Sequence, residues 1–294
     1  MALALDQRSR LMANTAHGPT LIAHRFGRSL GPDSSRAALA RLDWSTVVGV
    51  ETDCCLTGDG GIVLLHDDLL STGTDLDGWA HDRSAAELLA ARVRTSTGEL
   101  TDETVVGLDE ALDLLRDRAQ VIQLEVKATT DVALAERTAA ALCASRDVRE
   151  LGERIEIISF WPPAVEVAAR AGFTTRLIVA AAYAPAAFAR WACAAGVAGV
   201  ILEGPYWAEE PVRTWRAAGL SVMSGLVNDP AILARVLAFE PEHIATDRPH
   251  ELYRCLQASQ DADRRRSANS PADFGGDDVE PPEASVRARP GATG

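Results

Sequence analysis

The stretch TLIAHRFGRSLGPDSSRAAL, residues 20–39, begins with the apolar pattern of a buried strand and ends with the pattern of a helix. The apolar run stops at His24 and Arg25. Two interpretations are open at this point: the strand has reached solvent, or the two side chains stand at the edge of an active site. Because the same order of strand and helix recurs along the chain, this stretch also sets the pattern for the whole fold.

Short apolar or β-branched runs predict eight strands, and segments rich in Ala, Leu and Arg between most of them predict helices. The predicted strands are residues 20–25, 47–56, 121–127, 154–160, 175–181, 196–202, 220–227 and 243–247. Strands that alternate with helices form parallel sheets, and eight such units close into a (β/α)8 barrel. The sequence therefore predicts an α/β fold, a TIM barrel.

The chain is predicted to hold one barrel domain, residues 19–257, between two irregular ends. The interval 57–108 is too long for one crossover helix and carries a further apolar run, GIVLLHD, so we expect an insertion after the second strand. Residues 1–18 are predicted as a flexible N-terminal segment. Residues 258–294 are rich in Pro, Gly and Ser and are predicted as a disordered tail.

Composition narrows the class of protein. The 294 residues are 47% hydrophobic, which is enough for one large core. The net charge of −13 and the lack of a basic stripe indicate no nucleic-acid partner. Five cysteines without a CxxC pair or a Cys/His cluster argue against a zinc site and a disulfide framework. The sequence shows neither a secretory signal nor an apolar membrane span, so we expect a cytoplasmic protein.

Acidic residues lie on two of the predicted strands. Glu51 and Asp53 in VVGVETDCC share one face, since alternate residues of a strand point the same way, and so do Glu125 and Lys127 in VIQLEVK. Three carboxylates at one end of a barrel repel one another, by roughly 4 kcal/mol for a pair about 4 Å apart at an effective dielectric near 20. A hard divalent cation, Mg²⁺ or Ca²⁺, would remove that repulsion. An internal ion-pair network through Lys127 and Arg25 would also reduce it.

Two of the six histidines occupy similar positions in the sequence. His24 follows the apolar run TLIA, His66 follows GIVLL, and a charged residue comes directly after each of them. Two histidines near a divalent metal and two cations suit phosphoryl transfer, because one can take a proton from the attacking oxygen and the other can give one to the leaving oxygen. For either histidine alone, a structural role at a strand end is the alternative.

These residues together make the sequence resemble the glycerophosphodiester phosphodiesterase family. The matching motifs are, in chain order, IAHR, GPDSSRAAL, GVETDCCLTGDGGIVLLHD, LEVK and IATDRP. The resemblance runs from about residue 20 to residue 256. It implies a TIM barrel with a small insertion after the second strand, in agreement with the pattern of predicted strands.

The resemblance also implies the roles of individual residues. His24 and His66 match the catalytic histidines of the family, and Arg25 and Lys127 match the cations that bind the phosphate. The matching metal ligands are Glu51, Asp53 and Glu125, for one divalent cation, Mg²⁺ or Ca²⁺. The implied substrate is a small phosphodiester, in which a hydroxyl beside the phosphate attacks to give a cyclic phosphate that water then opens.

Three departures from the family pattern concern the substrate pocket. Phe26 replaces the usual glycine after His-Arg, and we expect it to narrow or reshape the mouth of the pocket. Pro32-Asp33-Ser34-Ser35 replaces Pro-Glu-Asn-Thr, and Ser34 or Ser35 can still cap the next helix. Ser224-Gly225-Leu226 stands where many members carry an aromatic residue. These changes predict intact phosphate and metal chemistry with altered recognition of the alcohol.

The altered pocket leaves other functions open. The first is a metal-dependent phosphodiesterase that releases a phosphomonoester and an alcohol. The second is a phospholipase D-like lyase that stops at the cyclic phosphate. The third is a non-catalytic barrel that binds a phosphate ester.

Overall fold

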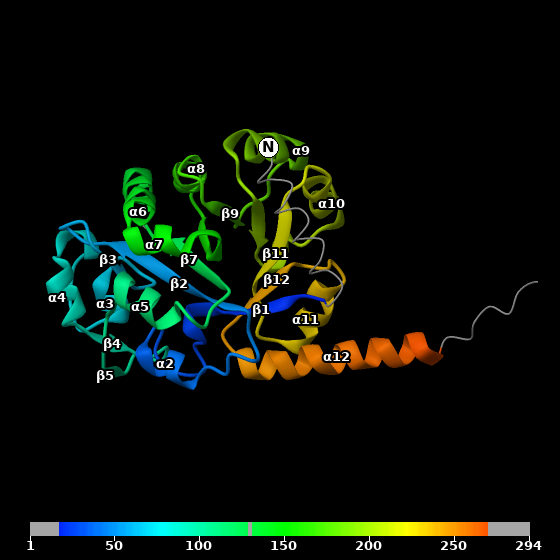
Figure 1. The fold of residues 1–294 in the computed structure, drawn as a ribbon, viewed down its shortest axis with the longest axis horizontal. Coiled ribbons are helices and arrows are strands. Elements are labelled where there is room, and N and C mark those ends of the chain that lie inside the picture. The colour runs from blue at the N-terminus through cyan, green and yellow to red at the C-terminus, as the bar shows by residue number, and fades with distance from the viewer. Residues whose placement is uncertain (1–17, 129–130, 270–294) are drawn as a thin grey trace, which may run out of the picture.

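The computed structural model describes residues 18–128 and 131–269. Within these ranges, eight parallel strands pair side by side, and β1 pairs with both β2 and β12, so the sheet closes on itself (Figure 1). The barrel strands are β1 (Thr20–Ala23), β2 (Gly49–Leu56), β7 (Val121–Val126), β8 (Ile155–Ser159), β9 (Thr174–Val179), β10 (Gly199–Leu202), β11 (Ser221–Leu226) and β12 (His243–Thr246). The predicted (β/α)8 barrel is therefore confirmed.

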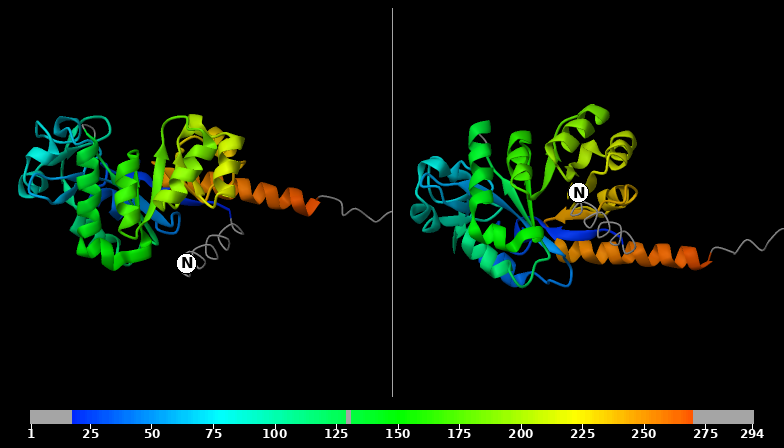
Figure 2. Two further views of the ribbon diagram at one scale, coloured as in Figure 1. Left: turned by 90° about the horizontal axis from the view of Figure 1, so that it is seen from above. Right: turned by 45° about the horizontal axis from the view of Figure 1, so that its top comes forward.

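A helix follows each barrel strand and packs on the outside of the sheet (Figures 1 and 2). These helices are α2 (Arg36–Arg41), α5 (Leu108–Leu115), α6 (Val132–Ala144) with the short α7 (Arg146–Leu151), α8 (Pro162–Arg170), α9 (Pro185–Ala195), α10 (Glu209–Ala217), α11 (Pro230–Leu237) and α12 (Pro249–Asn269). The Ser35 side chain accepts a hydrogen bond from the Ala38 amide and so caps α2, as the sequence predicted.

The segment between β2 and α5 forms a small unit beside the barrel. Its strand β3 (Ile62–Leu64) pairs antiparallel with β2 and with β6 (Val106–Gly107), and β4 (Arg92–Arg94) pairs with β5 (Leu100–Thr104). Two short helices, α3 (Leu70–Gly73) and α4 (Ala85–Leu89), complete it. The unit has its own apolar cluster, which includes Val63, Leu88 and Val93. It occupies the range 57–108 that we expect as an insertion, although its limits as a domain stay a prediction.

The last helix is longer than the sequence suggests. Helix α12 continues to Asn269 and projects beyond the barrel, at the end of the molecule opposite the insertion (Figures 1 and 2). The expected disorder from residue 258 is therefore wrong for 258–269, because no glycine or proline interrupts the chain between Pro249 and Pro271. Residues 1–17 and 270–294, where we expect flexible ends, lie outside the described residues.

The barrel interior is filled in layers. One layer is apolar and contains Ile22, Ile158, Ile178, Ile201 and Met223, each from a different strand. Side chains that fill a barrel in this way leave no open channel, so a ligand must bind at one end. Among the described helices, none is both long and apolar enough to cross a membrane.

Candidate active site

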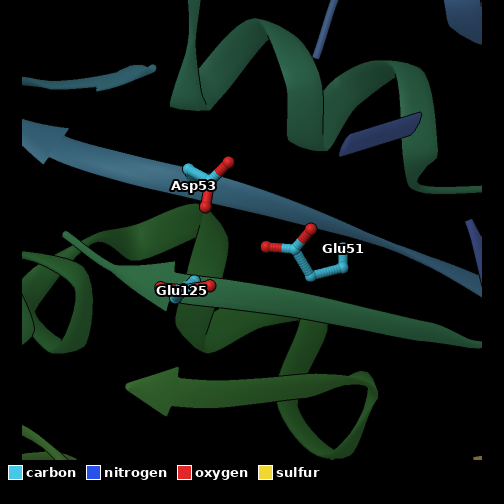
Figure 3. Close-up of side chains that lie close together, drawn as sticks. All are labelled: Glu51, Asp53 and Glu125. Carbon is cyan, nitrogen blue, oxygen red and sulfur yellow. The ribbon is translucent and has the colours of Figure 1, made fainter. Parts of the chain in front are cut away.

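Three acidic side chains meet inside the barrel near the carboxyl ends of β2 and β7. Asp53 on β2 stands opposite Glu125 on β7, and Glu51 lies two residues before Asp53 on the same face. All three are buried, and one carboxylate oxygen from each lies within 4.8 Å of the others (Figure 3). The sequence prediction that these residues come together agrees with this arrangement.

Two cations partly balance the acidic cluster. Lys127 Nζ lies 2.5 Å from Glu125 Oε1 and 3.1 Å from Asp53 Oδ1, and Arg25 Nε lies 3.1 Å from Asp53 Oδ2. Burial favours a neutral Asp53, but Lys127 and Arg25 outweigh it and lower the pKa of this carboxyl group. An ion-pair network is thus present, as one of the two sequence interpretations expected.

The network does not satisfy Glu51. Its Oε2 accepts a hydrogen bond from the Arg25 amide at 3.0 Å, but Oε1 is buried without a hydrogen-bond partner among the described residues. Burial, together with the charges of Asp53 and Glu125, raises the pKa of Glu51 well above its usual value. Burial also raises the pKa of Glu125 to about 7. An oxygen-only donor set with an unpaired buried oxygen fits a hard divalent cation, which these three residues could hold.

The backbone turns sharply directly after β1. His24, Arg25 and Phe26 form the 3₁₀ turn η2 (His24–Phe26), and Arg25 and Phe26 have φ values of 49° and 65°. These left-handed conformations are unfavourable for residues other than glycine. The hydrogen bond from the Arg25 amide to Glu51 and the burial of Phe26 hold the turn in place. The first strand therefore ends because the chain folds over the acidic cluster.

The structure corrects the role expected for Phe26. Its side chain is fully buried in the main apolar core, and it is not among the residues that line the two cavities described below. Because η2 turns the ring away from the site, Phe26 does not narrow the mouth of the pocket.

His24 is held by residues to which the sequence analysis assigned no role. Its Nδ1 lies 2.7 Å from Asp247 Oδ1, and the other Asp247 oxygen accepts a hydrogen bond from Asn228 Nδ2 at 2.7 Å. Burial opposes ionisation of Asp247, but the hydrogen bond with His24 prevails and lowers the pKa of Asp247. The ring is oriented so that Nε2 lies 3.7 Å from Glu51 Oε2, on the side of the acidic cluster.

Asp247 and Asn228 were missed as site residues for a physical reason. Asp247 directly follows β12 and Asn228 lies two residues after the end of β11, and a single polar residue after a strand is ordinary in a sequence. The motif IATDRP contained the signal for Asp247. Only closure of the barrel, which pairs β12 with β1, brings it next to His24.

His66 reaches the same site from the insertion. It follows β3, and its Nδ1 lies 3.0 Å from Asp67 Oδ1. Burial lowers the pKa of His66, although the nearby Asp53 charge opposes this effect. His66 is therefore mostly neutral at pH 7. The other six residues that the sequence singled out also lie at the carboxyl end of the barrel strands. The structure therefore brings all seven together: His24, Arg25, Glu51, Asp53, His66, Glu125 and Lys127.

Arg25 is fixed from two sides. Its Nη1 pairs with Asp33 Oδ2 at 2.7 Å, and the other Asp33 oxygen pairs with Arg28 Nε at 2.8 Å. Burial opposes the charge on Arg25, but Asp53 and then Asp33 overcome it and raise the pKa of Arg25. Asp33 belongs to the altered Pro-Asp-Ser-Ser segment, so this segment keeps an acid that positions the arginine.

Two cavities lie at the carboxyl end of the described barrel. The inner cavity, of about 180 Å³, is lined by His24, Glu51, Glu125, Lys127 and apolar side chains of the barrel interior. The outer cavity, of about 420 Å³, lies between the β1–α2 loop and the insertion. Both cavities are lined by Arg25 and His66. The two cavities therefore meet at a cation and a histidine, beside the acidic cluster.

The fold and the site place the protein in a class of TIM-barrel proteins that carry acids, histidines and cations at the carboxyl end of the strands. This is the end of the barrel at which TIM-barrel enzymes have their active sites. The model of the glycerophosphoryl diester phosphodiesterase family matches residues 46–251. The chain therefore belongs to this family, whose members are phosphoric diester hydrolases. The matched range begins 21 residues after Arg25 and so does not include His24 or Arg25.

Individual relatives agree with this assignment. The chain is similar to a glycerophosphodiester phosphodiesterase of Caldanaerobacter subterraneus, with 29% identity over 108 residues, 36% of this chain and 44% of the relative. It is also similar to glycerophosphodiester phosphodiesterase 1 of Mus musculus, with 32% identity over 117 residues, 39% of this chain and 35% of the relative. The matched parts thus span less than half of these relatives.

A solved structure covers more of the chain. A phosphodiesterase from Oleispira antarctica, in complex with the product sn-glycerol-3-phosphate, superposes with a TM-score of 0.71 and 26% identity. The superposition covers 83% of this chain and 99% of that structure.

Proposed function

We propose that the chain hydrolyses glycerophosphodiesters, or a related small phosphodiester, to a phosphomonoester and an alcohol. The observation that carries this proposal is the meeting of two cavities at Arg25 and His66. A phosphodiester has two organic arms on one phosphate. The phosphate would lie at the junction, one arm in the inner cavity and the other in the outer cavity.

The charges at the junction suit a phosphodiester. Arg25 and Lys127 would neutralise the phosphate oxygens, and their ion pairs with Asp53 hold both cations in place before the substrate binds. Glu51, Asp53 and Glu125 would hold one divalent cation, Mg²⁺ or Ca²⁺, which would polarise the phosphate and offset the charge that develops on it.

The two histidines would move the protons. In the first step, a hydroxyl beside the phosphate forms a bond to phosphorus and loses its proton to neutral His66. The bond to the departing alcohol breaks, and His24, which lies between Asp247 and Glu51, gives a proton to that oxygen. In the second step, water forms a bond to the phosphorus of the cyclic phosphate and loses its proton to His24. The bond between phosphorus and the first hydroxyl oxygen breaks, and His66 returns a proton to that oxygen.

A substrate screen tests the proposed activity. The protein is incubated with Mg²⁺ or Ca²⁺ and with glycerophosphocholine, glycerophosphoethanolamine, lysophospholipids and sugar diesters, and the products are followed by phosphorus NMR. We expect a phosphomonoester from at least one glycerophosphodiester. A cyclic phosphate that accumulates would instead identify the lyase, and metal-dependent ligand binding without turnover would identify a binding protein.

Histidine variants test the proposed roles. We expect His24→Ala and His66→Ala to lose at least about 10²-fold in turnover, as acid–base catalysis requires. His250→Ala is a matched control, because the His250 ring contacts the Asp43 amide away from both cavities. Normal turnover by both active-site variants would refute the proposed roles of the two histidines.

The cytoplasmic location of the protein is also a proposal, which cell fractionation tests.

A further inference from the structure

Glu203 faces the acidic cluster from the far side of the barrel. It comes directly after β10, and β10 is separated from β2 by three strands in either direction around the closed sheet. Glu203 lines the inner cavity together with Ile178 and Ile201. A ligand in this cavity would therefore lie between the acidic cluster and a fourth carboxylate that the mechanism above does not use.

Glu203 has unused hydrogen-bonding capacity. Burial raises the pKa of its carboxyl group, while the charges of His24 and Lys127 and a hydrogen bond from the Leu226 amide oppose this effect. Within residues 18–128 and 131–269, no cation lies within ion-pair distance of Glu203 and no side chain donates a hydrogen bond to it. Because a carboxylate can accept about four hydrogen bonds, Glu203 can accept more from a ligand.

Gly225 provides the space for this carboxylate. A Cβ atom at position 225 would lie 2.3 Å from Glu203 Oε1 and 2.7 Å from its Cδ, closer than real contacts allow. Gly225 also lines the inner cavity. Glu203 and Gly225 are therefore a matched pair: the carboxylate can keep this position only because position 225 has no side chain.

We propose that Glu203 is a specificity residue that accepts a hydrogen bond from a hydroxyl on the arm of the substrate held in the inner cavity. The inference rests on the proposed function. A cavity of about 180 Å³ is small for an organic ligand, so it suits a short polyol arm. A hydroxyl is favoured over an ammonium group because Arg25, Lys127 and the divalent cation proposed above would together more than offset the charges of the three carboxylates in the acidic cluster.

A pair of substrates that differ by one hydroxyl tests this role. Both are diesters of the same leaving alcohol, one with a glyceryl arm and one with a 2-hydroxypropyl arm. Each keeps the hydroxyl beside the phosphate. We expect the wild-type protein to prefer the glyceryl diester in kcat/KM by about 10- to 100-fold, as expected for one hydrogen bond to a charged group. Equal kcat/KM values would overturn the proposal.

Variants at the matched pair sharpen the test. We expect Glu203→Ala to lose the preference while it retains turnover of the 2-hydroxypropyl diester, and Glu203→Gln to keep part of it. Gly225→Ala should also reduce the preference, because the added methyl group displaces the carboxylate. Glu209→Ala, on the exposed first turn of α10, is the control. A preference that survives in Glu203→Ala would refute the assignment.

Two further measurements separate the outcomes. A 3-amino-2-hydroxypropyl diester that is preferred over the glyceryl diester would show an ammonium site and overturn the hydroxyl assignment. If the protein turns over none of the diesters, the proposed function fails. Calorimetry with glycerol phosphate and propanediol phosphate, in the presence of Mg²⁺, then still tests Glu203. Tighter binding of glycerol phosphate that is lost in Glu203→Ala supports its role, and equal binding of the two refutes it.

Discussion

At Phe26 the side chain and the backbone have opposite effects on stability. The left-handed backbone at a φ of 65° costs roughly 1 kcal/mol for a residue other than glycine. The fully buried ring contributes more, since removal of a buried phenylalanine costs about 3–5 kcal/mol. The usual glycine of the family would relieve the strain but leave a cavity in this core.

Substitution of Phe26 tests this balance. We expect Phe26→Gly to lower the free energy of unfolding by about 2–4 kcal/mol, measured by urea denaturation. Phe26→Ala is the matched control, because it loses the ring and keeps the strain, and it should be about 1 kcal/mol less stable than Phe26→Gly. A Phe26→Gly variant as stable as the wild type would show that the ring contributes little.

Asp247 is expected to position His24. The two oxygens of Asp247 accept hydrogen bonds from His24 and Asn228. In Asp247→Asn, one of these oxygens is replaced by an NH₂ group, which cannot accept, so the ring of His24 loses its defined orientation. We expect kcat to fall about 100-fold while KM changes only a few-fold. Asp229→Asn serves as control, because asparagine also caps α11 well. A change in KM alone would assign Asp247 to substrate binding instead.

At the scale of the elements, β2 and β7 create the acidic cluster by their register. The alternation along each strand was visible in the sequence, and so were the apolar runs that mark the eight strands. The polar segment that forms β4 and β5 was not predicted, because its charged and threonine residues alternate without a clear apolar face. The sequence did not identify three further residues of the site, because only closure of the barrel brings them there: Glu203, Asn228 and Asp247.

Binding of a divalent cation to the proposed site on β2 and β7 should raise the stability of the folded protein. A ligand that binds only the folded state at a concentration 100 times its Kd adds about 2.7 kcal/mol of stability. We therefore expect Mg²⁺ or Ca²⁺ to raise the Tm of the wild-type protein, and a chelator to reverse the increase. Glu51→Gln should abolish the response, whereas Asp113→Asn on the exposed face of α5 should retain it. An unchanged Tm at saturating metal would contradict the proposed site.

At the scale of the whole molecule, the opposite end of the barrel holds a second charged network. Arg176 on β9 is buried and pairs with Glu156 at 2.7 Å and with Glu242 at 2.9 Å. Gln123 also donates a hydrogen bond to Glu156 at 2.7 Å. Gln123 also stands opposite Glu51 on β2 and lines the inner cavity, so it lies between this network and the acidic cluster. The barrel therefore has ion pairs at one end and the candidate active site at the other.

This network makes stability depend on pH. Burial opposes ionisation of Glu156, but Arg176 prevails and lowers its pKa to about 2 from 4.5, which corresponds to roughly 3 kcal/mol at neutral pH. Because this pKa is lowered on folding, the contribution is complete above pH 4.5 and is lost as the pH falls towards 2.

Denaturation at several pH values checks this effect. Glu156→Gln should be less stable than the wild type by about 3 kcal/mol at pH 7, and the difference should shrink between pH 4.5 and pH 2. Glu150→Gln, an exposed surface pair with Arg146, should have no measurable effect. A difference that does not vary with pH would show that the network stabilises by packing rather than by charge.

The insertion has an apolar cluster separate from those of the barrel, and it forms most of one wall of the outer cavity. Apart from His66, the inner cavity is lined by residues on or just after the barrel strands. In the proposed mode of binding, the two arms of a diester are therefore selected by two units of the chain that can vary independently. Exchange of residues 57–105 for those of a relative would change which alcohol departs, while the arm that keeps the phosphate would still be chosen by the ends of β10 and β11.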